Sequence, residues 1–135
     1  MMRVMLDTNI LISAIVFESK LMLKLMQRLT DKYLIVLCSY VADELYEVVS
    51  DKFPAKMDRL EKFLIKFPFE LVHTPQVLPD DFEFEVRDKD DEHILYSAVS
   101  ADVDVLITGD KDLLVIAQDM ERPEILSHLE FLEKY

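Results

Sequence analysis

The hydrophobic and polar positions of the chain follow two patterns that alternate from one end to the other. Short apolar runs predict buried strands at residues 3–6, 33–37, 69–73 and 103–108. Apolar residues repeated every three or four positions predict helices at residues 10–17, 19–32, 40–51, 54–67 and 92–102, and residues 123–135 predict a short strand and a C-terminal helix. Strands that alternate with helices form a sheet covered on both faces. The pattern therefore predicts an α/β fold, a three-layer α/β/α sandwich with a central, mostly parallel sheet.

The composition is that of one folded domain, expected to span residues 1–135. Hydrophobic residues make up 51% of the 135 positions and charged residues 31%, a balance that excludes a disordered chain. No apolar run approaches the roughly 18 residues needed to span a bilayer, so no membrane partner is expected. Cys38 is the only cysteine, which excludes an internal disulfide and fits a reducing, cytoplasmic location.

Acidic residues stand near the ends of predicted strands and near the starts of the helices that follow. Asp7 and Asp110 come just after apolar runs, Glu44 lies about five residues into a predicted helix, and Asp91 precedes another. In an open α/β sheet, ligands bind outside the carboxyl ends of the strands, so these acids are expected to converge there. A divalent cation is the simplest way to relieve the repulsion between them.

Each acid also has an ordinary structural interpretation. Asp7 can cap the helix after it, although Thr8 or Asn9 is expected to take that role and to leave Asp7 free. Glu44 can be a solvated helix residue, although it lies too deep in the helix to be a cap. Ser39 is expected to cap the helix that carries Glu44.

Three aspartates precede the helix expected at 92–102, where one suffices as a cap: Asp88, Asp90 and Asp91. Asp91 is in register with the apolar face of that helix and is expected to point toward the sheet edge. Further along, Gly109 is expected to let the backbone turn sharply before Asp110, and Asp112 can be the cap of another helical turn.

The ligand atoms that these acids offer limit which metal ion can bind. Carboxylate oxygens suit Mg²⁺ or Mn²⁺, whereas zinc prefers histidine or cysteine. The three histidines, His73, His93 and His128, are dispersed and do not form a ligand set. The chemistry most often built on a site of carboxylates alone is phosphoryl transfer.

The net charge of −12 is unusual for a protein that binds nucleic acid. The basic residues are nevertheless grouped. Lys20, Lys24, Arg28 and Lys32 recur every four residues along one predicted helix, and a second basic segment covers residues 52–66. These groups are either the solvated faces of amphipathic helices or a basic flank that steers a polyanion toward the acids.

Four motifs in this order resemble the PIN domain, most closely the toxin-type PIN proteins of prokaryotic toxin–antitoxin pairs. They are LDTNILISA near the start, S-x-x-x-x-E-L at 39–45, D-D-x-x-I-L-x-x-A at 90–98 and LITGDKDLL at 106–114. The resemblance covers nearly the whole chain. It implies a Mg²⁺- or Mn²⁺-dependent endoribonuclease that cleaves single-stranded or structured RNA.

The resemblance also implies roles for individual residues and partners. The acidic quartet that holds metal and catalyses cleavage would be Asp7, Glu44, Asp91 and Asp110. Asp112 would be an auxiliary metal ligand, and Thr8, Asn9 and Thr108 would orient water or carboxylates. Asp88 or Asp90 can substitute for Asp91. An antitoxin and a second copy of the chain are the expected protein partners, with Lys20, Lys24 and Arg28 as candidates for RNA or partner binding. The alternative is a catalytically silent PIN-like module that binds RNA or protein.

Overall fold

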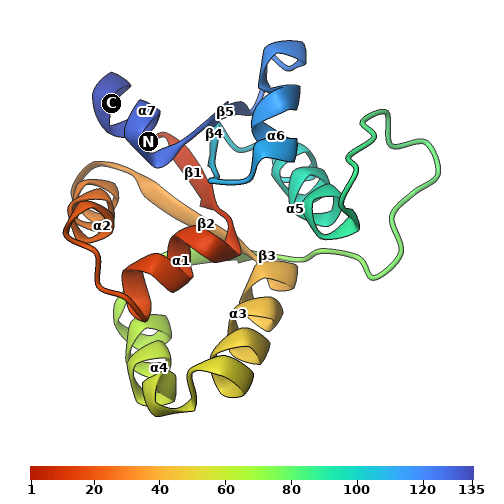
Figure 1. The fold of residues 1–135 in the computed structure, drawn as a ribbon. Helices are drawn as coiled ribbons and strands as arrows, with labels where there is room; N and C mark the ends of the chain where they lie inside the picture. The colour runs from red at the N-terminus through yellow and green to blue at the C-terminus, as the bar shows by residue number, and fades with distance from the viewer.

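The computed structural model describes residues 1–135 and contains one sheet of five parallel strands with helices on both sides (Figure 1). The strand order is β3-β2-β1-β4-β5, so the chain winds outward from β1 in one direction and then resumes on the other side at β4. The strands are β1 Arg3–Leu6, β2 Leu34–Cys38, β3 Phe69–Val72, β4 Val105–Ile107 and β5 Glu124–Leu126. The predicted three-layer α/β/α sandwich is confirmed.

The predicted helices are present, with small shifts at their ends. They are α1 Thr8–Ile15, α2 Lys20–Lys32, α3 Ser39–Lys52, α4 Met57–Lys66, α5 Lys89–Ser100, α6 Lys111–Ile116 and α7 His128–Lys134, with 3-10 turns η1 Pro54–Lys56 and η2 Ala117–Asp119. The largest shifts are of three residues: α5 begins three residues before the predicted position, and α4 begins three residues after it, because η1 takes up the predicted start. No helix has both the length and the apolar character that crossing a membrane requires.

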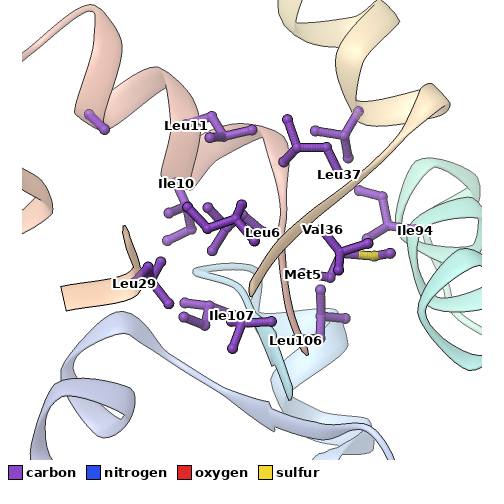
Figure 2. Packing of buried hydrophobic residues seen from close by; sticks show 14 of the residues in the cluster. Met5, Leu6, Ile10, Leu11, Leu29, Val36, Leu37, Ile94, Leu106 and Ile107 are labelled. Atoms are coloured by element: carbon purple, nitrogen blue, oxygen red, sulfur yellow. The ribbon is translucent and has the colours of Figure 1, made fainter. Parts of the chain in front are cut away.

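The core lies on both faces of the sheet because neighbouring residues of a strand point to opposite sides. The register pairs Met5 with Val36 and Leu106, and these residues pack with Ile94 of α5 (Figure 2). On the opposite face the core contains residues of β1 and β4 together with α1 and α2, namely Leu6, Ile107, Ile10 and Leu29. The apolar runs are thus buried on two sides, as parallel strands require.

The helix caps differ from those predicted. Asp7, and not Thr8 or Asn9, caps α1, because its Oδ1 accepts a hydrogen bond from the Ile10 N–H at 3.1 Å. The prediction that Ser39 caps α3 is also wrong. Ser39 is the first residue of the helix, and its hydroxyl accepts the Thr74 N–H at 2.8 Å, which ties the end of β3 to the start of α3.

The turn after β4 does not depend on glycine. Gly109 does not have a positive φ, and a Cβ added there would meet nothing within 4 Å, so the expectation of a sharp glycine turn is wrong. Side chains shape this turn instead. The Asp110 N–H donates to Thr108 Oγ1 at 3.0 Å, and the Asp112 N–H donates to Asp110 Oδ1 at 2.8 Å. Asp110 is therefore the cap of α6, and Asp112 lies in its first turn.

Candidate metal centre

A polar cavity of about 350 Å³ opens at the carboxyl edge of the sheet. It lies outside the ends of β1 and β4, where the strand order reverses and where ligands of open α/β sheets usually bind. Its walls come from α1, α3, α5 and the β4–α6 turn. The lining residues are Asp7, Thr8, Asn9, Ile12, Glu44, Val48, Lys52, Phe53, Asp88, Asp90, Asp91, Ile94 and Asp110. The fold thus gathers six carboxylates from separate parts of the chain.

Asp7 is held rigidly at the end of β1. Its side chain is only 3% exposed. One oxygen accepts the Ile10 N–H, and the other accepts the Thr108 hydroxyl. Burial raises the pKa of the Asp7 carboxyl, while the hydrogen bonds from Thr108 and Ile10 act against this shift and the nearby Asp110 adds to it. Both oxygens of Asp7 are therefore held in fixed positions at the end of β1.

Thr108 joins two of the acids. The residue is fully buried, and its hydroxyl donates to Asp7 and accepts the Asp110 N–H at 3.0 Å. One hydroxyl therefore sets the position of a carboxylate after β1 and of the turn after β4. Thr108 thus positions two acids of the cavity.

Asp91 is a second strongly perturbed acid of the cavity. It lies in the first turn of α5, is 6% exposed, and its Oδ2 is buried without a hydrogen-bond partner. Burial, followed by the neighbouring carboxyl of Asp110, raises the pKa of Asp91 to about 8. Single oxygens of Asp91, Asp110 and Asp112 lie within 4.8 Å of one another. Ionised carboxylates this close repel one another, and a cation between them would relieve the repulsion.

Glu44 lies on the α3 wall and does not belong to that close trio. It is half-buried, and burial raises the pKa of its carboxyl, with Asp90 and Asp88 adding to the effect. The Thr8 hydroxyl lies close enough to oppose this rise, but the contact lacks hydrogen-bond geometry, so Thr8 Oγ1 remains buried without a partner. Glu44 and Thr8 are thus two further oxygen donors at the cavity.

The remaining acids have structural roles that separate them from Asp91. Asp88 caps α5 through the Asp90 N–H, at 2.9 Å. Asp90 is exposed and accepts a hydrogen bond from the Tyr40 hydroxyl. Asp112 does not line the cavity, and its Oδ2 lies 3.5 Å from Arg87 Nη2. Of the three aspartates around the start of α5, Asp91 is therefore the buried one with a free oxygen.

The basic stripe of α2 does not reach the cavity. Lys20 and Lys24 are exposed and absent from its walls, and Arg28 is tied to the C-terminal helix, where its Nη1 donates to the Leu132 carbonyl at 2.7 Å. The cavity instead contains Lys52, the first residue of the second basic segment, and Phe53, which the sequence did not indicate as a site residue. The four-residue spacing of Glu44, Val48 and Lys52 is the signal that places Lys52 on the wall with Glu44.

The donor set fits a hard divalent cation. The potential metal ligands of the lining are oxygens, from six carboxylates, the Thr8 hydroxyl and the Asn9 amide, with neither histidine nor cysteine among them. The Asp91 Oδ2 has no partner in the protein, and burial together with neighbouring carboxyls raises the pKa values of Asp7, Glu44 and Asp91, so no protein cation compensates the ionised forms of these acids. Mg²⁺ or Mn²⁺ would supply the missing positive charge.

Comparison with known proteins places the chain in a family. The profile of the PIN domain matches residues 3–112, and the chain belongs to the PIN domain family. Its fold is similar to that of a chain in the crystal structure of VapBC2 from Rickettsia felis bound to a DNA fragment from their promoter. That likeness has a TM-score of 0.66 at 20% identity and covers 93% of this chain and 98% of the other, which shows a shared fold. No curated protein matches the sequence.

Proposed function

We propose that the protein is a Mg²⁺- or Mn²⁺-dependent endoribonuclease that hydrolyses phosphodiester bonds in single-stranded or structured RNA. The observation that carries this proposal is the convergence of Asp7, Asp91 and Asp110 at one end of the sheet, with one buried oxygen of Asp91 left without a partner. Membership of the PIN domain family supports it, since the family resemblance implies nuclease activity.

In this proposal Asp7, Asp91 and Asp110 hold the cation, with Glu44 and Asp112 beside them. A cation bound there would supply Lewis-acid chemistry for phosphodiester hydrolysis. The protein contributes preorganisation. Thr108 fixes the carboxylate of Asp7 and the turn at Asp110, so neither has to move when the charge of the transition state develops.

We also propose that the chain is the toxin of a toxin–antitoxin pair, as its motifs suggest and as the fold shared with a VapBC2 chain supports. An apolar cavity of about 210 Å³ between α1, α2 and α4 offers a surface for an antitoxin. Three cations of α4 surround it, namely Arg59, Lys62 and Lys66. An amphipathic segment with an acidic edge would complement such a surface. Pairing of two copies of the chain into a homodimer is part of the same proposal.

A catalytically silent PIN-like module that binds RNA or protein is the second candidate. The net charge of −12 favours it, because an excess of acid weakens the attraction between a protein and RNA. The two candidates differ in what the cation does. In the nuclease it is required for bond cleavage, and in the silent module it affects only stability or binding.

Cleavage of end-labelled single-stranded RNA by the purified protein separates the two candidates. We expect cleavage with Mg²⁺ or Mn²⁺, none with EDTA, and none from Asp7→Asn, in which an amide replaces a ligand while the helix cap is kept. The variant Asp58→Asn, on α4 and outside the cavity, is the matched control. Equal cleavage by Asp7→Asn and the parent would show that these acids are not the catalytic site.

A further inference from the structure

The acidic cavity continues as a groove away from the proposed metal ligands. Glu44, Val48 and Lys52 lie on successive turns of one face of α3, and all three line it. Eight residues of helix separate Glu44 from Lys52, a length of about 12 Å. This is roughly the rise of three to four stacked nucleotides at about 3.4 Å each. The groove is therefore long enough for a short stretch of a nucleic-acid strand.

The far end of the groove differs chemically from the end with the acids. Lys52 is the only cation among the lining residues, and it is exposed. Phe53 follows it and also lines the groove. A cation beside an aromatic ring, next to a site proposed to cleave a phosphodiester, matches the two chemical parts of a nucleotide, the phosphate and the base.

A second aromatic ring extends this end. Phe17, in the turn between α1 and α2, lies edge-on to Phe53 with ring centroids 5.4 Å apart and an interplanar angle of 83°. Phe17 is 63% exposed, although burial of a phenyl ring is strongly favoured. The next residue, Glu18, has a left-handed backbone with φ of 49° and forms an ion pair with Arg59. Phe17 is thus exposed next to a residue, Glu18, whose backbone has a conformation that non-glycine residues seldom adopt.

We propose that the exposed ring of Phe17, supported edge-on by Phe53, forms a stacking platform for an unpaired base of the substrate, and that Lys52 binds a backbone phosphate beside it. The inference rests on the proposed nuclease function and specifies its substrate as single-stranded at this position. Bases of a duplex are stacked on their neighbours and have no face free for a phenyl ring, whereas unstacked bases of loops and single strands do. The continuity of Phe53 with the acidic cavity favours RNA over a protein partner as the occupant of this platform.

The test measures binding separately from cleavage. The full chain with Asp7→Asn, which keeps RNA intact, is titrated with a fluorescein-labelled single-stranded RNA in Mg²⁺. A set of RNAs with a single abasic position moved along the strand is titrated in the same way. Phe17→Ala is expected to weaken binding of the intact RNA by about five- to 150-fold. For the RNA that lacks the stacked base, the same substitution is expected to cause no further loss.

Lys52→Ala is expected to weaken binding and to lower the slope of log affinity against log salt by about 1. Controls on residues outside the groove, Ile65→Ala and Lys32→Ala, should bind as the parent does, and thermal melting of each variant checks the fold. The proposal is overturned if Phe17→Ala binds RNA as tightly as the parent does. It is overturned as well if the substitution lowers the affinity for every abasic RNA by the same factor. It is also overturned if Phe17→Ala weakens binding of the antitoxin alone, since the platform then belongs to a protein partner.

Failure of this inference can be told apart from failure of the proposed function. If the parent chain cleaves RNA and Phe17→Ala has the same kcat and KM, the platform is wrong and the nuclease stands. If the parent does not cleave RNA but binds single strands in a way that depends on Phe17, the platform stands and the nuclease proposal fails.

Discussion

The substitution Asp91→Asn should make the metal-free protein more stable at neutral pH. Burial and the neighbouring Asp110 raise the pKa of Asp91 from 3.8 to about 8 in the folded state. A carboxyl whose folded pKa is raised contributes stability below its unfolded pKa, and this contribution is lost as the pH rises through the folded pKa. The metal-free parent is therefore expected to lose stability between about pH 4 and pH 8. An asparagine keeps the shape of the side chain but cannot ionise, so it removes this loss.

The size of the effect follows from the shift. One pKa unit corresponds to about 1.4 kcal/mol, so the full shift sets an upper limit of about 6 kcal/mol. The carboxyl borders an open cavity, where screening by solvent reduces the interaction, and we expect about 2–3 kcal/mol. For a domain of this length that corresponds to roughly 10 °C in Tm.

Thermal unfolding followed by circular dichroism between pH 5 and pH 8 measures this effect. In EDTA at pH 8 the Tm of Asp91→Asn should lie above that of the parent, and the difference should shrink toward pH 5. Addition of Mg²⁺ should raise the Tm of the parent more than that of the variant, because a cation that binds the folded state stabilises it by mass action. A lower Tm for Asp91→Asn in EDTA at pH 8 would refute the assignment of Asp91 as an uncompensated buried acid.

Three other predictions concern single contacts. Asp91→Asn should lower kcat for RNA cleavage by more than about 100-fold, because loss of a residue that only supports a metal ligand already lowers activity by about 10- to 100-fold. Substitution of the exposed Asp90 by Asn should lower kcat far less. The reverse ranking in the cleavage assay would make Asp90 the ligand. Thr108→Val should lower the cleavage rate by about 10- to 100-fold, whereas Thr108→Ser, which keeps the hydroxyl, should retain much of the rate. Equal rates for the two variants would show that the hydroxyl does not position the acids. Lys62→Glu with Lys66→Glu should weaken antitoxin binding in a calorimetric titration, while Lys20→Glu with Lys24→Glu should not; an equal loss in both pairs would point to net charge and not to the cavity between α1, α2 and α4.

The predictable parts of the fold are those with long periodic signals. The apolar runs located all the strands, and the amphipathic spacing of α5 identified Asp91 as the inward-facing aspartate, which the structure shows to be buried. That inference needed only the register of α5, so it is correct although the predicted start of the helix is wrong by three residues.

The local caps were not predictable, because neighbouring polar residues offered equivalent choices. Asp7, Thr8 and Asn9 can each accept a backbone N–H at the start of α1. The choice of Asp7 depends on Thr108, which lies 101 positions away in sequence and donates to its second oxygen. Likewise, the pairing of β2 with β3 brings the Thr74 N–H next to Ser39, and the Ser39 hydroxyl accepts this N–H instead of capping α3.

The sequence also could not predict which residues reach the site only because two helices pack together. In the sequence Lys52 is only the first residue of a basic segment, and Phe53 is a single apolar residue after a helix. They become part of the candidate site only because α3 runs beside α1 (Figure 1). Arg28 shows the opposite case, since its place in a regular basic stripe suggested a binding role while its side chain in fact holds the carbonyl of Leu132.

The central claim is that acids from separate elements form one centre for a divalent cation. Anomalous scattering from crystals of the protein soaked in Mn²⁺ tests it most directly, since it locates the ion itself. We predict a peak in the cavity within coordination distance of carboxylate oxygens of Asp7, Asp91 and Asp110, and its loss in crystals of Asp7→Asn soaked in the same way. A cavity without a peak in the parent crystals, at Mn²⁺ concentrations that support RNA cleavage, would contradict the account.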